Sequence, residues 1–363
     1  EITIGDWSSD VCSSDLFISF VGNSRDHISE MGQLESVYIE GIDDADADSI
    51  LHGDLTVERI AKIIKDGDVH NIVVMSGAGI SVNAGIPDFR TPGTGLYYNL
   101  QQYNLPTPES MFDIEYFRQN PESFYSFVME LFPEQYLPTY THYFIKLLYK
   151  KGILLRDYTQ NIDGLERQAE IPESRLVESH GTMATCSCID CRRPQKIEWF
   201  KQQVIQGAVP RCKCGGLVKP DIVFFGEPLP QKFNWMSTAD MASCDLLIVM
   251  GTSLAVQPFA GLVHKVKENV PRFLINKEPV GPFRFYQMDC CFRDVVLLDD
   301  CDKGVLKLCD LIGWRNELED LYKKGREKLA KQQKEFLKMK ASLQKRNSVA
   351  ETVRSEERRV GKE

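Results

Sequence analysis

The sequence predicts an α/β fold: a Rossmann-like doubly wound parallel sheet with a smaller inserted domain made of a helical module and a zinc-binding module. Short segments that are apolar throughout, such as "IVVM" and "LLIVM", alternate with segments of helical spacing. Strands that are apolar on both faces are typical of parallel sheets covered by helices on both sides. The alternation is interrupted over residues 91–149 and again around a group of cysteines, which predicts the inserted domain.

The elements follow in order along the chain. Residues 55–65 have apolar side chains at helical spacing behind Thr56 as an N-cap, and a short strand follows at 70–75. A helix and a strand recur over 144–163, and from 244 onward the expected elements are a strand at 244–253, a helix at 259–268, strands at 272–276 and 295–300, and a helix at 304–314. Ligands of such sheets bind beyond the carboxyl ends of the strands.

The chain divides into three parts by composition. We expect a disordered leader over 1–50, a main domain over 51–315 and a basic helical tail over 316–363. Within the main domain, the Rossmann-like parts cover about 51–92, 150–182 and 218–315, the helical insertion about 93–149 and the zinc module about 183–217. Within the leader, the acidic stretch "EGIDDADADS" has too few apolar residues to fold alone.

Two terminal segments do not have the sequence character of a folded domain. "WSSDVCSSDL" and "RSEERRVGKE" resemble translated vector sequence, so the first part of the leader and the last residues of the tail are expected to be non-native. The tail carries ten Lys or Arg against two Glu from Lys323 to Arg346, and this charge favours a solvated helix over a binding element.

Composition excludes several function classes. The net charge of −9 gives no sign of nucleic-acid binding, and no run of eighteen apolar residues suggests a membrane span. We therefore expect neither nucleic acid nor membrane as a partner, while the oligomeric state stays open. Eleven cysteines in a chain of this size more often indicate reduced thiols or metal ligands than disulfides.

A glycine-rich turn begins where the first apolar strand stops, in "SGAGISVNAGIPDFR". Gly77 and Gly79 allow the backbone to approach a pyrophosphate, whose charge a following helix N-terminus would favour. Val82 stands where the dinucleotide fingerprint has its third glycine, so the motif alone leaves a nucleotide site and a structural turn equally open. An acid, a ring and a guanidinium then follow in Asp88, Phe89 and Arg90, which suits a loop that closes over a cofactor.

Polar side chains follow other strands. Gln160, Asn161 and Asp163 offer the amides and the carboxylate that suit ribose hydroxyls and a carboxamide, although an Asx-rich turn that caps a helix is the alternative. Thr252 and Ser253 end a further strand and could reach ribose or phosphate. In "VESHGT" a histidine stands where a short strand would end, and a lone histidine is more often structural than catalytic.

Cysteines cluster with the spacing of a metal site. Cys188 and Cys191 form a C-x2-C pair, and Cys212 and Cys214 form a C-x-C pair. Four thiolates fill the tetrahedral positions of zinc and leave none for water, so such a site is structural. Cys186 is a fifth candidate. A redox role for C-x2-C would need a thioredoxin-like helix start, which "CIDCRRPQ" does not offer.

Taken together, these motifs resemble the sirtuins, the NAD-dependent protein lysine deacylases. "GAGIS" with "GIPDFR", "TQNID", "HG", the paired cysteines, "KPDIVFFGE" and "GTSL" occur in the sirtuin order, and the resemblance covers about Leu55 to Trp314. Details such as "LIGWRNELEDL" look most like the sirtuin-2 type, with the sirtuin-3 type next. The C-x-C pair departs from the C-x2-C that is usual in the family.

The resemblance implies a role for each matching residue. It identifies His180 as the general base and Asn161 as a second catalytic residue, and it implies one structural zinc. It implies that the segment from Ile222 to Glu227 pairs with an extended substrate, contacted by Val223, Phe225, Gly226 and Glu227, although a plain buried strand is the alternative. NAD would contact Ala78, Gly79, Ile80, Ser81, Val82, Asp88, Phe89, Arg90, Gln160, Asn161, Ile162, Asp163, Thr252, Ser253, Asn276, Lys277, Glu278 and Cys301.

The implied reaction removes an acyl group from lysine. The acyl oxygen attacks C1′ of the nicotinamide ribose, nicotinamide leaves and Phe89 shields the reacting face. His180 then takes a ribose hydroxyl proton, and water completes the release of lysine and O-acyl-ADP-ribose without a metal. Acylated lysines of histones, tubulin or other proteins are the expected substrates. We expect a cytoplasmic location with some nuclear access, with a mitochondrial one as the alternative.

Other functions are weighed against this one. A zinc-containing nicotinamide dehydrogenase would need the full glycine fingerprint and a metal with an open position, and Val82 and the all-cysteine set both oppose it. A non-catalytic NAD-binding scaffold finds no support, because the expected catalytic residues are all present. Mono-ADP-ribosyl transfer stays open as a neighbouring activity.

Overall fold

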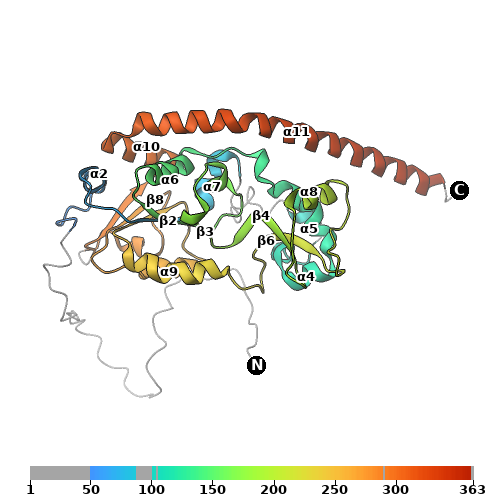
Figure 1. Ribbon diagram of the computed structural model, residues 1–363, viewed down its shortest axis with the longest axis horizontal. Coiled ribbons are helices and arrows are strands. Elements are labelled where there is room, and N and C mark those ends of the chain that lie inside the picture. The colour runs from blue at the N-terminus through green and yellow to red at the C-terminus, as the bar shows by residue number, and fades with distance from the viewer. Residues whose placement is uncertain (1–49, 87–99, 104, 289–290, 361–363) are drawn as a thin grey trace, which may run out of the picture. The chain divides into compact units, whose positions relative to one another are not determined.

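The computed structural model describes residues 50–86, 100–103, 105–288 and 291–360 (Figure 1). Its larger sheet has six strands, all parallel, in the order β3-β2-β1-β7-β8-β9. The chain order reverses between β1 and β7, which is the point where ligands bind in doubly wound sheets. The predicted fold class is confirmed. The strands are β1 (Ile72–Ser76), β2 (Leu154–Thr159), β3 (Leu176–Glu178), β7 (Leu246–Met250), β8 (Arg272–Asn276) and β9 (Asp294–Leu298).

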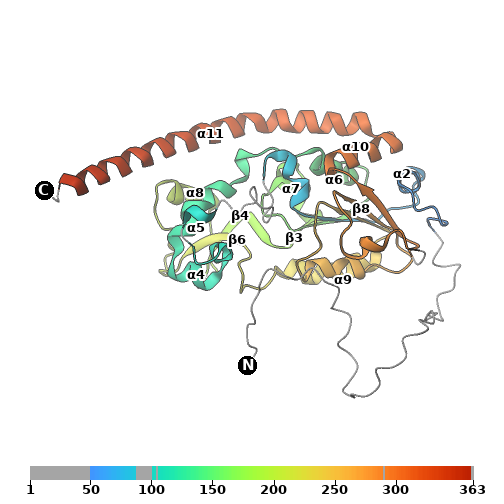
Figure 2. The ribbon, with the colours of Figure 1, turned by 180° about the vertical axis from the view of Figure 1, so that it is seen from behind.

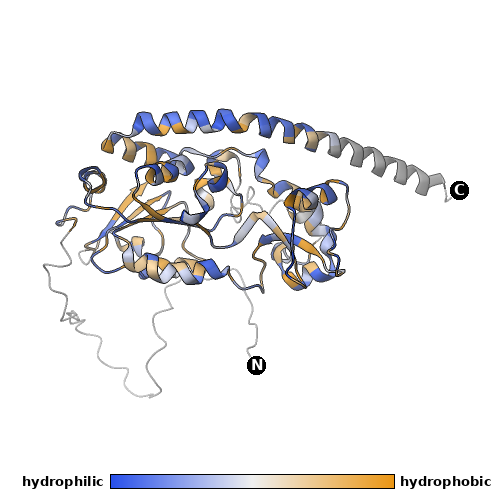
Figure 3. Cartoon of the chain, in the orientation of Figure 1, coloured by the Kyte–Doolittle hydropathy of each residue, from blue (hydrophilic) through white to orange (hydrophobic). Residues whose placement is uncertain are grey.

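Helices cover both faces of this sheet. In Figures 1 and 2, α6 (Tyr140–Lys150) and α10 (Cys301–Ile312) lie on the side opposite to α9 (Gln231–Ser243). Alternate residues of β1 belong to the two resulting cores, Ile72 and Val74 to one and Val73 and Met75 to the other. The central strands β1 and β7 consist almost entirely of apolar residues and are buried along their whole length, and orange, hydrophobic segments accordingly run through the sheet in Figure 3. α2 (Val57–Asp66) and α7 (Leu165–Gln168) complete the α-helices around the sheet.

Most predicted elements are present, although not all are of the expected type. Thr56 caps α2, and its hydroxyl oxygen accepts a hydrogen bond from the Arg59 amide at 3.2 Å. The helix expected at 259–268 is instead a shorter 3-10 helix, η8 (Phe259–His264). Other short 3-10 turns are η1 (Ala78–Ile80), η2 (Val82–Ala84), η7 (Glu173–Arg175) and η9 (Gly281–Phe285).

The second domain has a three-stranded antiparallel sheet and a helical module around one aromatic core. Phe224 makes edge-to-face contacts with Phe112, Phe117 and Phe124 at ring separations of 5.9, 5.5 and 5.0 Å. Such contacts add to the burial of each ring. The elements are β4 (Gly181–Cys188), β5 (Pro194–Gln195), β6 (Val218–Ile222), α4 (Ile114–Gln119), α5 (Pro121–Phe127), α8 (Ile197–Ile205), η3 (Leu100–Tyr103), η4 (Pro108–Phe112), η5 (Val128–Leu131) and η6 (Pro133–Gln135).

Two details of this domain differ from the expected boundaries. Helix α6, expected within the insertion, packs against the larger sheet through Phe144 and Leu148. Strand β6, expected with the Rossmann-like part, pairs with β4. Sequence periodicity reports which face of an element is apolar, but it does not report which core that face joins.

The C-terminal helix α11 (Arg315–Val360) was expected to be a solvated tail, and this is wrong for its first part. Tyr322 stacks on Tyr140 of α6 with ring centroids 3.7 Å apart, and farther along Phe336 meets Phe132 of the helical module at 6.1 Å. Among the described residues, no helix combines the length and the apolar character that crossing a membrane requires.

Candidate active site and zinc site

The site begins where the loops after β1 and β7 pack against each other without space between them. A Cβ atom on Gly77 would lie 2.8 Å from the Gly251 carbonyl oxygen, and one on Gly79 would lie 2.6 Å from the Gly251 Cα. The Gly79 amide donates to that same carbonyl at 2.8 Å. Only glycines allow this approach, so the motif has a backbone role at the reversal point of the sheet.

A chain of hydrogen bonds joins the ends of β1 and β2. The Ser81 hydroxyl donates to Asp163 at 2.6 Å, and the other Asp163 oxygen accepts the Leu165 amide at 3.0 Å. The buried Asn161 side chain donates to the Gly77 carbonyl at 3.1 Å and lies 3.3 Å from the Ser81 hydroxyl. These bonds use the amide hydrogens of Asn161 and leave its oxygen as an acceptor.

The end of β7 joins the same group through Gln160. The Thr252 hydroxyl donates to the Gln160 side-chain oxygen at 2.6 Å, while the Gln160 backbone amide donates to the Ser76 carbonyl oxygen at 3.0 Å. Neighbouring Ser253 is exposed, and Ile162 is half-buried beside the core of the second domain. The structure therefore brings together predicted residues that are far apart in the sequence.

His180 lies just beyond β3 with its ring held in one tautomer. Its Nδ1 is 2.9 Å from the Gln160 carbonyl oxygen, which can only accept, so Nδ1 carries the hydrogen of the neutral ring. The other nitrogen, Nε2, is then the unprotonated one. Burial lowers the pKa of His180, partly offset by the bond to Gln160, and the neutral form is the form that can act as a base.

The helix expected after the glycine turn is not an α-helix in the described part of this loop. Ala78 and Ile80 lie in η1, and Val82, whose side chain is exposed, begins η2. These 3-10 turns are too short for a helix-dipole argument. Asp88, Phe89 and Arg90 lie outside the described residues.

The residues expected at the adenosine side follow β8 and β9. Asn276 is half-buried and donates to the Glu278 carbonyl at 2.9 Å, whereas the Lys277 and Glu278 side chains are exposed. Cys301 is buried at the start of α10, where its thiol contacts the Ile275 carbonyl at 3.6 Å. The Asn83 side chain bridges to Asp300 at 2.8 Å, which ties the glycine loop to this edge.

The segment expected to bind the peptide leaves β6 and passes between the two domains. Val223 is half-buried, with its amide bonded to the His180 carbonyl at 2.8 Å, and Phe225 is 51% exposed. Gly226 is exposed at φ +88°. Glu227 differs from the other three: its carboxylate is buried in an ion pair with Lys219 at 2.8 Å, so it supports the segment from within.

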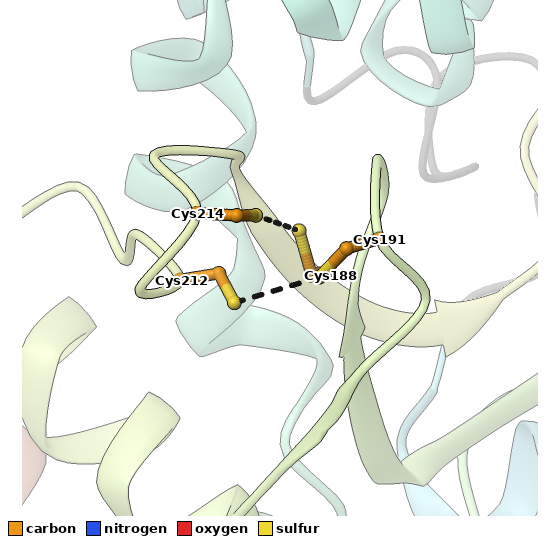
Figure 4. Close-up of side chains that lie close together, drawn as sticks. All are labelled: Cys188, Cys191, Cys212 and Cys214. Atoms are coloured by element: carbon orange, nitrogen blue, oxygen red, sulfur yellow. Dashed lines mark hydrogen bonds between the residues drawn. The ribbon is translucent and has the colours of Figure 1, made fainter.

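The four paired cysteines converge on one point (Figure 4). Cys188 and Cys214 have their sulfurs 3.5 Å apart, and those of Cys191 and Cys212 are 3.7 Å apart. A tetrahedron with Zn–S bonds of about 2.3 Å has S···S edges of about 3.8 Å. The set fits a structural zinc ion and needs no histidine.

Two neighbours explain why the irregular C-x-C pair can complete this site. Gly215 adopts φ +92°, which turns the chain sharply after Cys214. A Cβ on Gly216 would lie 2.7 Å from the Cys188 sulfur and 2.4 Å from Asp190. Cys186 lies outside the set: it is buried, and its thiol contacts the Gln195 carbonyl at 3.5 Å.

Sequence reasoning missed the buried groups behind the site. Lys219 supports the peptide segment, and His142 and Glu166 lie next to Asp163. Lys219, which stands among apolar residues, was the available signal, because a buried charge needs a partner or a function. Glu166 stands in a polar segment, which gave no such signal.

Comparisons with known proteins identify the relatives of this chain. The model of the Sir2 family matches residues 77–258. The NAD-dependent protein deacetylase sirtuin-2 of Danio rerio is 44% identical over 342 residues, which cover 90% of this chain and 90% of that protein. The NAD-dependent protein deacetylase sirtuin-3 of Mus musculus is 50% identical over 76% of this chain and 81% of its own. The NAD-dependent protein deacetylase hst2 of Schizosaccharomyces pombe is 49% identical over 73% and 79%.

Proposed function

The chain belongs to the Sir2 family, and from this membership and the geometry of the site we propose how its residues carry out the family's reaction. It is an NAD-dependent protein deacetylase that acts on acetylated lysine side chains of proteins. The observation that carries the residue assignments is the convergence of the ends of β1, β2, β3 and β7 around the Gly79 and Gly251 contact.

The loops at the reversal point would hold NAD. The backbone from Ala78 to Val82 provides close approach for the phosphates, and Thr252 and Ser253 provide hydroxyls. The residues after β8, with Cys301, are proposed for the adenosine end. When bound, NAD supplies the nicotinamide leaving group and the ADP-ribose that accepts the acetyl group.

Asn161 and Asp163 would orient the nicotinamide side. The free amide oxygen of Asn161 accepts hydrogen bonds, and the Asp163 carboxylate, positioned by Ser81, accepts from an amide. Asp88, Phe89 and Arg90 remain proposed as a loop over the cofactor, with Phe89 shielding the reacting face.

His180 would act as the general base. Its unprotonated Nε2 takes the proton of a ribose hydroxyl, and the Gln160 carbonyl stabilises the imidazolium that forms because Nδ1 stays a donor to it. By removing this proton, His180 would make the hydroxyl oxygen nucleophilic toward the acyl carbon. The zinc ion supports the second domain and takes no part in these steps.

The peptide would bind along residues 223–226. Val223 and Phe225 are proposed to line the path of the lysine side chain, with the Lys219 and Glu227 ion pair fixing the segment from behind. Several backbone N–H and C=O groups of this segment already form hydrogen bonds within the protein. A substrate peptide that adds as a strand would therefore pair with the backbone groups that have no partner in the protein. Acetylated histones and tubulin are proposed substrates, and a cytoplasmic location with some nuclear access is proposed from the acidic residues before Leu51.

A single assay tests the function and separates it from ADP-ribosyl transfer. The chain is incubated with an acetyl-lysine peptide, with and without NAD, and the products are followed by mass spectrometry. We expect nicotinamide, deacetylated peptide and O-acetyl-ADP-ribose only with NAD. Nicotinamide release with ADP-ribose attached to protein, and no loss of acetyl groups, would contradict deacetylation.

A further inference from the structure

Three carboxyl groups lie behind the proposed nicotinamide side without a cation. We call Asp157, Asp163 and Glu166 the acidic cluster. Asp157 and Glu166 are 0% and 1% exposed, and no lysine or arginine of the described residues forms an ion pair with any of the three. One oxygen of Asp157 and one of Glu166 have no hydrogen-bond partner. A buried, unpaired carboxylate is costly, so such a group tends to keep its proton.

His142 lies beside two members of the cluster, and its surroundings favour the neutral ring. Polar atoms of His142, Asp163 and Glu166 all lie within 4.8 Å of one another. The Thr139 amide donates to His142 Nδ1 at 3.2 Å, which leaves the ring hydrogen on Nε2, an atom that is buried and without a partner. Full burial lowers the pKa of His142 to about 3, which favours the neutral ring beside these carboxyl groups.

The surroundings of Asp163 and Glu166 differ in the charge that they favour. Burial raises the pKa of Asp163, but its carboxyl accepts hydrogen bonds from Ser81 at 2.6 Å and from the Leu165 amide at 3.0 Å, and these bonds favour the carboxylate form. Glu166 is more deeply buried and faces the negative charge of Asp163. Burial, followed by the neighbouring carboxyl groups of Asp163 and Asp157, raises the pKa of Glu166 well above its ordinary value.

Glu166 also contacts the residue that positions Asn161. The Thr159 side chain is one of the groups that influence the pKa of Glu166, and the Thr159 hydroxyl oxygen accepts a hydrogen bond from the Asn161 backbone amide at 3.0 Å. Glu166 thus lies next to Asp163 and beside the residue that positions Asn161.

We propose that Glu166 is a positioning residue that remains protonated in the folded enzyme and holds Asp163 and Asn161 in place for the nicotinamide end of NAD. The inference rests on the function proposed above. The protonated carboxyl places a neutral donor and acceptor next to Asp163, so only Asp163 carries charge at this side of the site.

Substitutions at Glu166 separate a neutral from a charged group. Glutamine has the shape of a protonated carboxyl, so Glu166→Gln should keep the KM for NAD within about threefold of wild type at pH 7, whereas Glu166→Ala should raise it about tenfold, the equivalent of one lost hydrogen bond. A Glu166→Gln enzyme as impaired as Glu166→Ala would overturn the proposal, because it would show that the carboxylate is needed.

The pH dependence gives a readout that a purely structural role would not change. In wild type, ionisation of Glu166 at alkaline pH places a second charge beside Asp163, so the KM for NAD should rise, and this rise should be missing in Glu166→Gln. The other titratable groups that face Glu166 are Asp163, His142 and Asp157, whose pKa burial raises to about 8. The same alkaline rise in Glu166→Gln, with its loss in Asp157→Asn, would assign the effect to Asp157 and overturn the proposal.

Two measurements do not depend on activity. The infrared carbonyl band of a protonated carboxyl should weaken in Glu166→Gln relative to wild type at pH 7, and an unchanged band would contradict the proposal. Because the pKa of Glu166 is raised in the folded state, unfolding releases its proton above pH about 4.5 and wild-type stability falls with rising pH. The advantage in Tm of Glu166→Gln should therefore grow from about pH 5 to 8.

These measurements also distinguish a failure of the proposed function from a failure of the proposal for Glu166. If wild type releases no nicotinamide from NAD with an acetyl-lysine peptide, the proposed function fails. The infrared band and the Tm difference still decide whether Glu166 holds a proton.

Discussion

His180 shows how local hydrogen bonding decides the chemistry of one side chain. The sequence places this histidine within eleven positions of three cysteines, so a ligand role and a base role were both open. In the structure the four cysteine thiols form the zinc site without the histidine. The Gln160 carbonyl oxygen accepts a hydrogen bond from Nδ1 of His180. In this tautomer Nε2 carries no hydrogen and can accept a proton. The residue type alone does not determine which tautomer is present.

Replacing His180 by alanine should abolish most turnover without loss of fold. We expect deacetylation to fall by at least about a hundredfold, the usual contribution of a general base, while the affinity for NAD stays close to wild type. Peptide deacetylation followed by mass spectrometry and NAD binding by calorimetry measure the two effects. His264→Ala, at an exposed histidine, is the matched control, and near-normal turnover of His180→Ala would refute the assignment.

The pH profile should report the same histidine. Burial lowers the pKa of His180, so its neutral, active form persists below the ordinary value of 6.5. We expect the acid limb of kcat/KM, which follows groups of the free enzyme, to have its midpoint below pH 6.5. A midpoint above that value would mean that burial does not control this group.

Among the strands and loops, the zinc site shows why spacing alone was ambiguous. A C-x-C pair can place two sulfurs on one metal only if the chain turns immediately, and Gly215 in the left-handed region provides that turn. Gly216 then lets the loop approach Cys188. The fifth cysteine, Cys186, belongs to the same strand as Cys188, but its thiol contacts a backbone carbonyl instead.

We expect Cys214→Ala to lose zinc and to unfold the second domain, because binding of a structural metal is coupled to folding. Cys186→Ser is the matched control and should keep one zinc per chain. Metal analysis by mass spectrometry and circular dichroism test both variants. Zinc lost from Cys186→Ser but retained in Cys214→Ala would show that the pair is misassigned. Added zinc beyond one equivalent should leave turnover unchanged.

At the scale of the whole molecule, the long C-terminal helix α11 contacts both the larger-sheet domain and the helical module, which the sequence analysis describes as separate parts. Arg326 donates to the Pro138 carbonyl at 3.1 Å, and Lys340 pairs with Glu130 at 2.6 Å, so contacts continue from the α6 side to the helical module. Between residues 315 and 342 of α11 most lysines are exposed, as the charge predicts, while Tyr322, Arg326, Phe336 and Lys340 lie on the docked face.

Phe336→Ala should therefore destabilise the protein, and the neighbouring Leu337→Ala should not. Phe336 is 9% exposed and contacts the core of the second domain, whereas Leu337 is 44% exposed. We expect the free energy of unfolding to fall by about 1–3 kcal/mol for Phe336→Ala and by less than about 0.5 kcal/mol for Leu337→Ala. Denaturant titration measures both, and equal effects would show that the docked face is misplaced.

Much of this site was readable from the sequence because its residues follow strands. Gln160, Asn161, Thr252 and His180 each come directly after an apolar segment, and parallel strands bring their carboxyl ends to one edge. The inward position of Glu227 could not be predicted. Its carboxylate is buried in an ion pair with Lys219 of β6, and the spacing of the two residues in the sequence does not show which way the side chain turns.

Local patterns thus specified the strands, the glycine turn, the cysteine pairs and the family, since these depend on residue type and short spacing. Tertiary packing decided the rest. Which core α6 and β6 join, how α11 docks, which nitrogen of His180 is free and why Glu166 would keep its proton all depend on contacts between segments distant in the chain. The physical reason is that burial and hydrogen-bond partners set the charge and orientation of a side chain, and both exist only once the chain has folded.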